Sequence, residues 1–221
     1  MLKAVTIVGL LLLLCSCMGS GDEPSEEQRR FPFATYDDEM PPQSDRRFTA
    51  GEHIGLITPG MPMATMENLY GSGVVESREL PAGEGTTVPG YVLFPGTPDE
   101  LFVELGEDKQ PLRVRFSNPR ATWYDAETGL SIGTGLLELR EMNGTSFEFS
   151  GFGWDYSGTV TDWHGGDLKD LLVRLTYAPE PLTGGLPDSL IGDVRLSSDS
   201  ASVQGLGISV REIIVPIREE D

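Results

Sequence analysis

The stretch Gly133–Gly144, GTGLLELREMNG, has the same pattern as the earlier stretch Gly60–Gly71, GMPMATMENLYG. In both, apolar residues follow the first glycine by three, six and nine positions, and a glycine closes the stretch. This spacing places the apolar side chains on one face of a short helix, and glycine commonly ends helices. They are Met63, Met66 and Leu69 in the first stretch, and Leu136, Leu139 and Met142 in the second. We therefore predict two short helices, with Pro62 in the first turn of one and Thr134 capping the other.

The similarity continues after each predicted helix. Leu101–Leu105, LFVEL, corresponds to Leu171–Leu175, LLVRL, and each follows a glycine-containing loop, which indicates the second strand of a hairpin. Further on, Val114–Ser117, VRFS, corresponds to Val194–Ser197, VRLS. Leu112–Phe116 alternates apolar and charged residues, as expected of a strand with one buried and one solvated face.

These patterns predict a sheet-rich α+β fold built from two tandem units. Each unit is expected to be a short helix packed on an antiparallel β-meander, since helices of this length are not stable alone in water. The first unit is assigned to residues 48–125 and the second to residues 126–221.

The N-terminal region has the features of a bacterial secretory leader. Lys3 precedes an apolar run, Ala4–Leu14, which is too short to span a bilayer, for which about 20 apolar residues are needed. Leu14–Cys17, LCSC, resembles a lipobox, with an aliphatic residue three positions before the cysteine and a small residue directly before it. We expect residues 1–16 to be a signal peptide and Cys17 to carry fatty-acyl chains such as palmitate, because Cys15 would place leucine at the position before cleavage.

Residues 17–47 are predicted to form a flexible tether between the lipid and the folded region. Met18–Arg47 contains four prolines, eight acidic residues and four arginines, a composition too polar to fold by itself. The residue after Cys17 is Met18 and not the aspartate that retains enterobacterial lipoproteins in the inner membrane, so the resemblance implies the outer membrane. The sequence does not distinguish the periplasmic face of this membrane from its outer face as the location of the folded region.

The two helix patterns resemble two known groups. One is the small outer-membrane-assembly lipoproteins of the SmpA/OmlA type, and the other is the secreted β-lactamase inhibitor proteins, which contain two helix-plus-sheet repeats. Phe147–Gly158, FEFSGFGWDYSG, also looks like a motif of uncharacterised lipoproteins of Bacteroidota. The first two resemblances imply protein–protein binding and not catalysis.

Composition and motifs exclude several classes of function. With 35 acidic against 16 basic residues, the formal net charge is −19, which would repel nucleic acid. The sequence contains no G-x-S-x-G, Walker or H-E-x-x-H motif, and no thiol after Cys17. We predict no cofactor, no bound metal and no enzymatic activity.

The stretch Gly151–Trp163, GFGWDYSGTVTDW, contains the strongest candidates for a ligand surface. If extended, it would place Phe152, Trp154 and Tyr156 on one face, beside Asp155, and such a strip suits either the core or a binding surface. Its candidate ligand residues are Phe152, Trp154, Asp155, Tyr156 and Trp163. A metal site formed by Asp162, His164 and Asp167 is a weaker hypothesis, because aspartate and glycine are ordinary turn residues.

The sequence as a whole favours a lipid-anchored outer-membrane protein that acts as a non-enzymatic protein-binding or envelope-assembly module. Its expected contacts are the membrane, through the lipid on Cys17, and an envelope protein. The alternative is a cell-envelope glycan-binding protein or hydrolase that uses Trp154, Asp155, Tyr156, Asp162 and His164.

Overall fold

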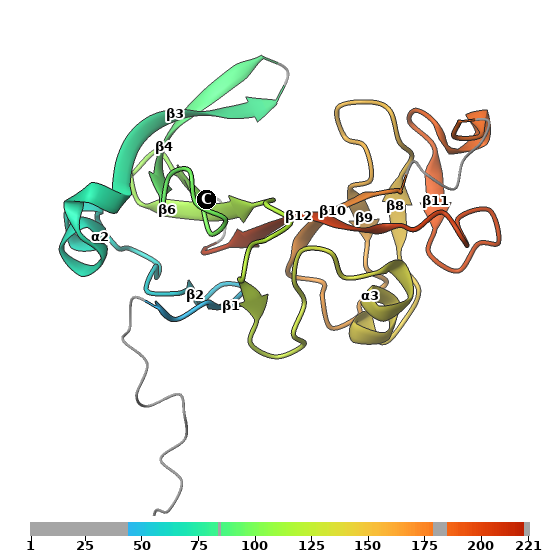
Figure 1. Ribbon diagram of the computed structural model, residues 1–221, viewed down its shortest axis with the longest axis horizontal. Coiled ribbons are helices and arrows are strands. Elements are labelled where there is room, and N and C mark those ends of the chain that lie inside the picture. Colours follow the sequence, from blue (N-terminus) through green and yellow to red (C-terminus); the bar gives the residue numbers. More distant parts are fainter. Residues whose placement is uncertain (1–43, 84, 179–184, 219–221) are drawn as a thin grey trace, which may run out of the picture. The chain divides into compact units, whose positions relative to one another are not determined.

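The structure, a computed structural model, describes residues 44–83, 85–178 and 185–218. In these residues it contains two α-helices and three β-sheets (Figure 1). The predicted sheet-rich α+β class is therefore confirmed. The predicted signal peptide, Cys17 and the tether up to residue 43 lie outside the described residues.

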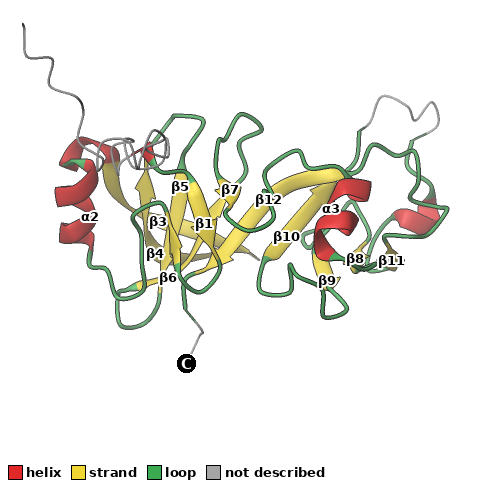
Figure 2. Ribbon diagram, turned by 90° about the horizontal axis from the view of Figure 1, so that it is seen from below, coloured by secondary structure: helices red, strands yellow, loops and turns green. Residues whose placement is uncertain are grey.

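The largest sheet is antiparallel throughout and has the order β10-β12-β6-β5-β4-β3. Its strands are β3 (Val75–Gly83), β4 (Thr86–Leu93), β5 (Leu101–Leu105), β6 (Pro111–Phe116), β10 (Leu172–Thr176) and β12 (Ser209–Pro216). β3 to β6 form a meander, and β12 then inserts between β6 and β10 (Figures 1 and 2). One sheet thus combines strands from both halves of the sequence.

Two smaller sheets adjoin it. One has the order β2-β1-β7, with β1 (Arg47–Thr49) antiparallel to β2 (His53–Ile54) and parallel to β7 (Tyr124–Asp125). The other has the order β11-β8-β9, where β8 (Glu148–Ser150) and β9 (Val160–Asp162) form a hairpin and β11 (Arg195–Ser197) pairs with β8. A bridge between Thr159 and Arg174 connects the start of β9 with β10.

Both predicted helices are present at corresponding positions. α2 (Met63–Tyr70) and α3 (Leu136–Asn143) each begin three residues after the first glycine of the pattern and end before the closing glycine. Gly144 has a left-handed φ of 73°, and its N–H donates a hydrogen bond to the Glu141 carbonyl. The closing glycines therefore end the helices as predicted. Two 3₁₀ turns, η3 (Ser72–Val74) and η4 (Asp188–Leu190), complete the helical elements of the described residues.

Two details of the helix prediction are wrong. Leu69 is 37% exposed, and Tyr70 packs against the core in its place. The reason is that Tyr70 lies four positions after buried Met66 and therefore on the same face of the helix. Thr134 does not cap α3. Its hydroxyl oxygen accepts a hydrogen bond from the Ser131 N–H, and Gly135 occupies the capping position without a side-chain hydrogen bond.

The proposed correspondence between Val114–Ser117 and Val194–Ser197 is also wrong. The first segment belongs to β6 in the large sheet, whereas the second belongs to β11, which pairs only with β8. The strand of the second half that pairs with β6 in the large sheet is β12 and not β11. Alternation of apolar and charged residues is common to many half-buried strands, so it could not distinguish β11 from β12.

The buried apolar side chains form a continuous cluster that includes residues of both halves. Its largest fully buried members are Phe48, Phe116, Trp123, Phe147, Phe149 and Phe152. The two predicted units therefore share a core as well as a sheet.

Asp45, Arg46 and Arg47, the last residues assigned to the tether, belong to the folded region. The guanidinium of Arg46 lies 5.1 Å from the ring centre of Phe94 and 4.8 Å from that of Trp123. Its Nε donates to Asp99 Oδ2 at 2.9 Å. These contacts outweigh the polar composition that suggested a tether, because they set the cation against two neighbouring aromatic rings and pair its charge.

Asp99 should make the stability of the protein sensitive to acid. Partial burial raises the pKa of Asp99, but hydrogen bonds from the Thr122 N–H and from Arg46 outweigh burial and hold the pKa below its ordinary value of 3.8. A carboxyl with a lower pKa in the folded state stabilises the fold above its unfolded pKa, and this stability is lost as the pH falls through the folded pKa.

We expect Asp99→Asn to lower the free energy of unfolding at pH 7 by about 1.5 to 3 kcal/mol, the usual contribution of hydrogen bonds to charged groups. The difference from the wild type should shrink below pH 4, and urea denaturation across this range measures it. Glu76→Gln is the control, because Glu76 is paired with Arg78 at the surface, where both side chains are about half exposed. A difference that stays constant down to pH 2 would contradict the assignment.

Candidate functional site

The face of the large sheet that is turned away from the core carries a row of paired charges. Val103, Val114 and Val173 are fully buried on the core side, so their strand neighbours point to the opposite face. The charged residues there are Glu104 on β5, Arg113 and Arg115 on β6, Arg174 on β10 and Glu212 on β12. Alternation along four strands thus gathers three cations and two anions.

The charges of this face neutralise one another in a network. One carboxylate oxygen of Glu104 accepts a hydrogen bond from Arg113 Nε at 2.6 Å, and the other forms an ion pair with Arg115 Nε at 3.5 Å. Glu212 pairs with Arg174 at 3.3 Å and with Arg115 at 4.0 Å. Glu104 is only 6% exposed, so its carboxylate depends on these two arginines. The network fixes the positions of the guanidinium groups across the sheet.

This charged face is the floor of a pocket of about 430 Å³, which we call the sheet groove. It is lined by Pro81, Ala82, Gly83, Glu104, Arg113, Arg115, Asp155, Tyr156, Leu172, Arg174, Glu212 and Ile214. One wall is the end of β3, where Arg115 Nη2 donates to the Pro81 carbonyl at 2.9 Å. The opposite wall is the loop between β8 and β9, where Arg211 Nη2 donates to the Ser157 carbonyl at 3.2 Å. Arginines on β6 and β12 therefore tie the floor to both walls.

The β3 wall exists because the β3–β4 hairpin bends over the sheet, as Figure 1 shows. Leu80 is fully buried although the residues before it on β3, Ser77 to Glu79, are exposed. A Cβ on Gly90 would lie 2.3 Å from Leu80 Cδ1 and 2.6 Å from the Val103 carbonyl oxygen. Gly90 thus leaves the space into which Leu80 folds.

The loop that forms this wall does not have the extended conformation considered for the aromatic strip. Residues 151–158 form turns and not a strand, and Gly153 and Gly158 have left-handed φ values of 83° and 70°. Phe152 and Trp163 are buried in the core, at 1% and 7% exposure, so they cannot form a ligand surface. The glycines reverse the chain and break the alternation on which the prediction depended.

The remaining candidates of the strip lie at or near the sheet groove. Asp155 and Tyr156 line it, and Tyr156 is 45% exposed. Trp154 is half-buried, packs edge-on against Tyr156 with 5.2 Å between ring centres, and donates its indole N–H to the Gly151 carbonyl at 3.0 Å. Trp154 therefore supports Tyr156 from within the loop.

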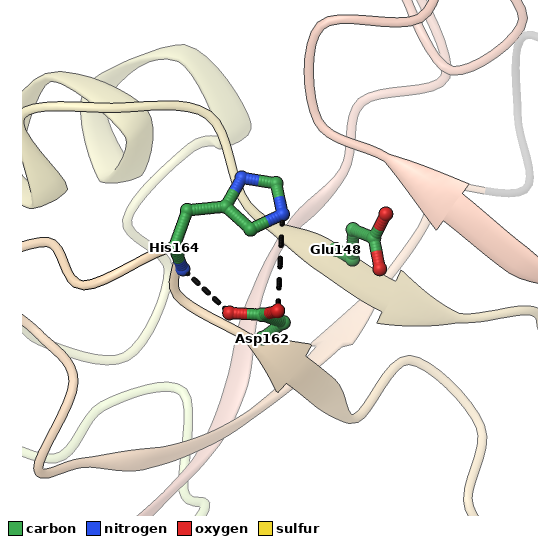
Figure 3. A group of neighbouring side chains, drawn as sticks. All are labelled: Glu148, Asp162 and His164. Atoms are coloured by element: carbon green, nitrogen blue, oxygen red, sulfur yellow. Dashed lines mark hydrogen bonds and ion pairs between the residues drawn. The ribbon is translucent and has the colours of Figure 1, made fainter.

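The proposed metal ligands come together only in part. Asp162 and His164 lie with Glu148, and their potential ligand atoms are all within 4.8 Å of one another (Figure 3). Asp167 is not in this group. Its N–H donates to the Asn143 carbonyl at the end of α3. Glu148 was missed because it is 14 residues before Asp162 and only strand pairing brings the two together.

The residues of the alternative enzyme or glycan site are divided between two places. Asp155 and Tyr156 lie in the loop that closes the β8–β9 hairpin, whereas Asp162 and His164 lie at its open end beside Glu148. The structure therefore does not bring the five residues into one site. The sheet groove was not predicted, because its floor combines residues from position 104 to position 212 and the sequence shows no signal of their pairing.

Comparison with known proteins gave no match to a family model, to a curated protein or to a solved structure. Among residues 44–83, 85–178 and 185–218, no helix has the length and apolar character needed to cross a membrane.

Proposed function

We propose that this chain is a lipid-anchored outer-membrane protein that binds an envelope protein in the sheet groove without catalysing a reaction. The observation that carries the proposal is the groove itself, with its network of paired arginines and glutamates between two walls. Attachment through Cys17 rests on the lipobox resemblance and the apolar leader.

The groove has the chemistry of a protein-binding surface. Arginine and tyrosine are enriched in the energetically important parts of such surfaces, and a floor that is already paired needs little rearrangement on binding. Tyr156 and Leu172 are 45% and 43% exposed at its edge and offer apolar contact beside the charges. A partner segment with its own polar groups could exchange hydrogen bonds with the arginines while it covers these two side chains.

We further propose that the fold derives from two related units that meet at the groove. α2 and α3 begin 73 residues apart and have the same length, and each is followed by antiparallel strands. β6, the last strand of the β3–β6 meander, and β12, the last strand of the second half, pair antiparallel in the large sheet. This arrangement supports the resemblance to two-repeat β-lactamase inhibitor proteins and to SmpA/OmlA-type lipoproteins, and it implies that the groove floor lies across the junction of the units.

Site-specific photo-crosslinking in intact cells tests the proposal. A photoreactive phenylalanine at position 156 should yield a crosslink to one discrete envelope protein, whereas the same group at position 124 should not. Tyr124 is the matched control, because it is also an exposed tyrosine, at 39%, but lies on β7 outside the groove.

Two further variants separate anchoring from recognition. Cys17→Ala should abolish the lipid mass increment and reduce the crosslink, because the protein is no longer held at the bilayer surface. Arg174→Ala should weaken the crosslink while the lipid and the fold remain. Equal crosslinking from positions 156 and 124, or a crosslink only to glycan, would overturn the protein-binding proposal.

A further inference from the structure

We propose that Glu148, Asp162 and His164 form a binding site for a divalent transition-metal ion, with Zn²⁺ as the ion best suited to the donors. One imidazole nitrogen and two carboxylates are a ligand set that zinc uses in proteins, and hard cations such as Ca²⁺ prefer oxygen alone. The potential ligand atoms lie within 4.8 Å of one another. The site is at the open end of the β8–β9 hairpin, away from the loop that lines the sheet groove.

A β-bulge places the two carboxylates opposite each other. Glu148 pairs with Asp162, but the next residue of β8, Phe149, pairs with Val160, so Thr161 is the extra residue of β9. A regular register would set Thr161 and not Asp162 across from Glu148. Directly opposed carboxylates repel, and a cation between them removes that cost.

The imidazole is held over the same space by its own backbone. The His164 N–H donates to Asp162 Oδ1 at 2.7 Å, and His164 adopts a left-handed φ of 52°. This turn brings His164 Nε2 to 4.0 Å from Asp162 Oδ2, on the side where the carboxylate of Glu148 lies (Figure 3). Three different backbone positions therefore direct ligand atoms to one point.

The side chains can close on an ion without moving the strands. Ligand atoms around tetrahedral zinc are about 3.3 Å apart, given bond lengths near 2.0 Å. Asp162 and His164 have side-chain exposures of 56% and 36%, so their side chains can rotate and bring the ligand atoms closer to this spacing. Arg195 Nη1 lies 3.1 Å from Glu148 Oε2 and competes with the ion, but its side chain is 73% exposed and leaves easily.

Calorimetric titration of the full chain with ZnCl₂ tests the site. The protein should carry alanine at Cys15 and Cys17 and no polyhistidine tag, so that neither thiol nor tag binds the metal. Asp162→Asn and His164→Asn should each weaken zinc binding by tenfold or more, the scale of effect found when even an outer partner of a metal ligand is lost. Both changes preserve the turn, since asparagine can accept the hydrogen bond from the His164 N–H and tolerates a left-handed φ.

Matched controls make the result specific. Asp167→Asn and His53→Asn remove the nearby aspartate and the other histidine of the chain and should leave zinc affinity unchanged. Arg195→Ala should tighten binding, because it removes the cation that competes for Glu148. Absence of zinc binding, or equal binding by wild type and His164→Asn, would overturn the proposal, as would CaCl₂ binding as tightly as ZnCl₂.

Discussion

Trp123→Ala should lower the free energy of unfolding by about 3 to 5 kcal/mol, the range for removing a fully buried tryptophan. The side chain of Trp123 has no exposure to solvent, and its indole N–H donates to the Asp99 carbonyl at 3.0 Å. Its ring also forms one of the two aromatic faces that hold the Arg46 guanidinium. Alanine would leave a cavity and remove the support that keeps Arg46 paired with Asp99.

Urea denaturation followed by circular dichroism measures this loss. Trp154→Ala is the control, because Trp154 is only half-buried and sits in a surface loop, so its loss should cost far less. Trp123→Phe should lie between the two, since it keeps an apolar ring but loses the indole hydrogen bond. A loss below 1 kcal/mol for Trp123→Ala would show that the cluster around Arg46 does not stabilise the fold.

Gly158→Ala should destabilise the protein by about 2 to 4 kcal/mol, the combined scale of overpacking and left-handed strain. A Cβ at Gly158 would lie 2.1 Å from the Leu175 carbonyl oxygen, which is fixed in β10, and Gly158 has a φ of 70°. The Leu175 N–H also donates to the Gly158 carbonyl at 2.8 Å, so the loop cannot withdraw without losing this bond.

Gly153→Ala separates the clash from the backbone conformation. Gly153 lies in the same loop with a φ of 83°, but its Cβ would meet only Ile191 at 3.5 Å, an ordinary contact. We expect this variant to lose about 1 kcal/mol, from the left-handed conformation alone. Thermal or urea unfolding of the two variants measures the difference, and equal losses would mean that the approach of the loop to β10 is not tight.

The sequence predicted the parts of the fold that local patterns determine. The helices were found because apolar spacing and closing glycines act within 12 residues, and β5 matched the predicted Leu101–Leu105. Leu112–Phe116 was correctly assigned one buried and one solvated face, because alternation along one strand is sufficient for that conclusion.

Features that depend on distant pairing could not be predicted in this way. The insertion of β12 beside β6 joins Ile213 to Phe116, and alternation gives no information on which strand will be its neighbour. Apolar and small residues alternate in 151–158, which suits an extended segment, yet left-handed glycines turn the chain there. Nothing in the sequence indicates that Glu148 lies beside Asp162, because a β-bulge in the structure sets the two residues opposite each other.

The position of β12 also has a consequence for how the chain folds. β6 ends at residue 116, but the strand that satisfies its free edge begins at residue 209. Strands of such large sequence separation pair slowly, and until they do, the unpaired edge can form hydrogen bonds with a strand of another chain. While the chain folds, β3 to β6 therefore present an open edge until β12, which begins 93 residues after the end of β6, has paired with it. We expect aggregation to occur mainly in this interval. A peptide with the sequence of residues 209–216, added during refolding, should pair with the open edge of β6 and reduce aggregation.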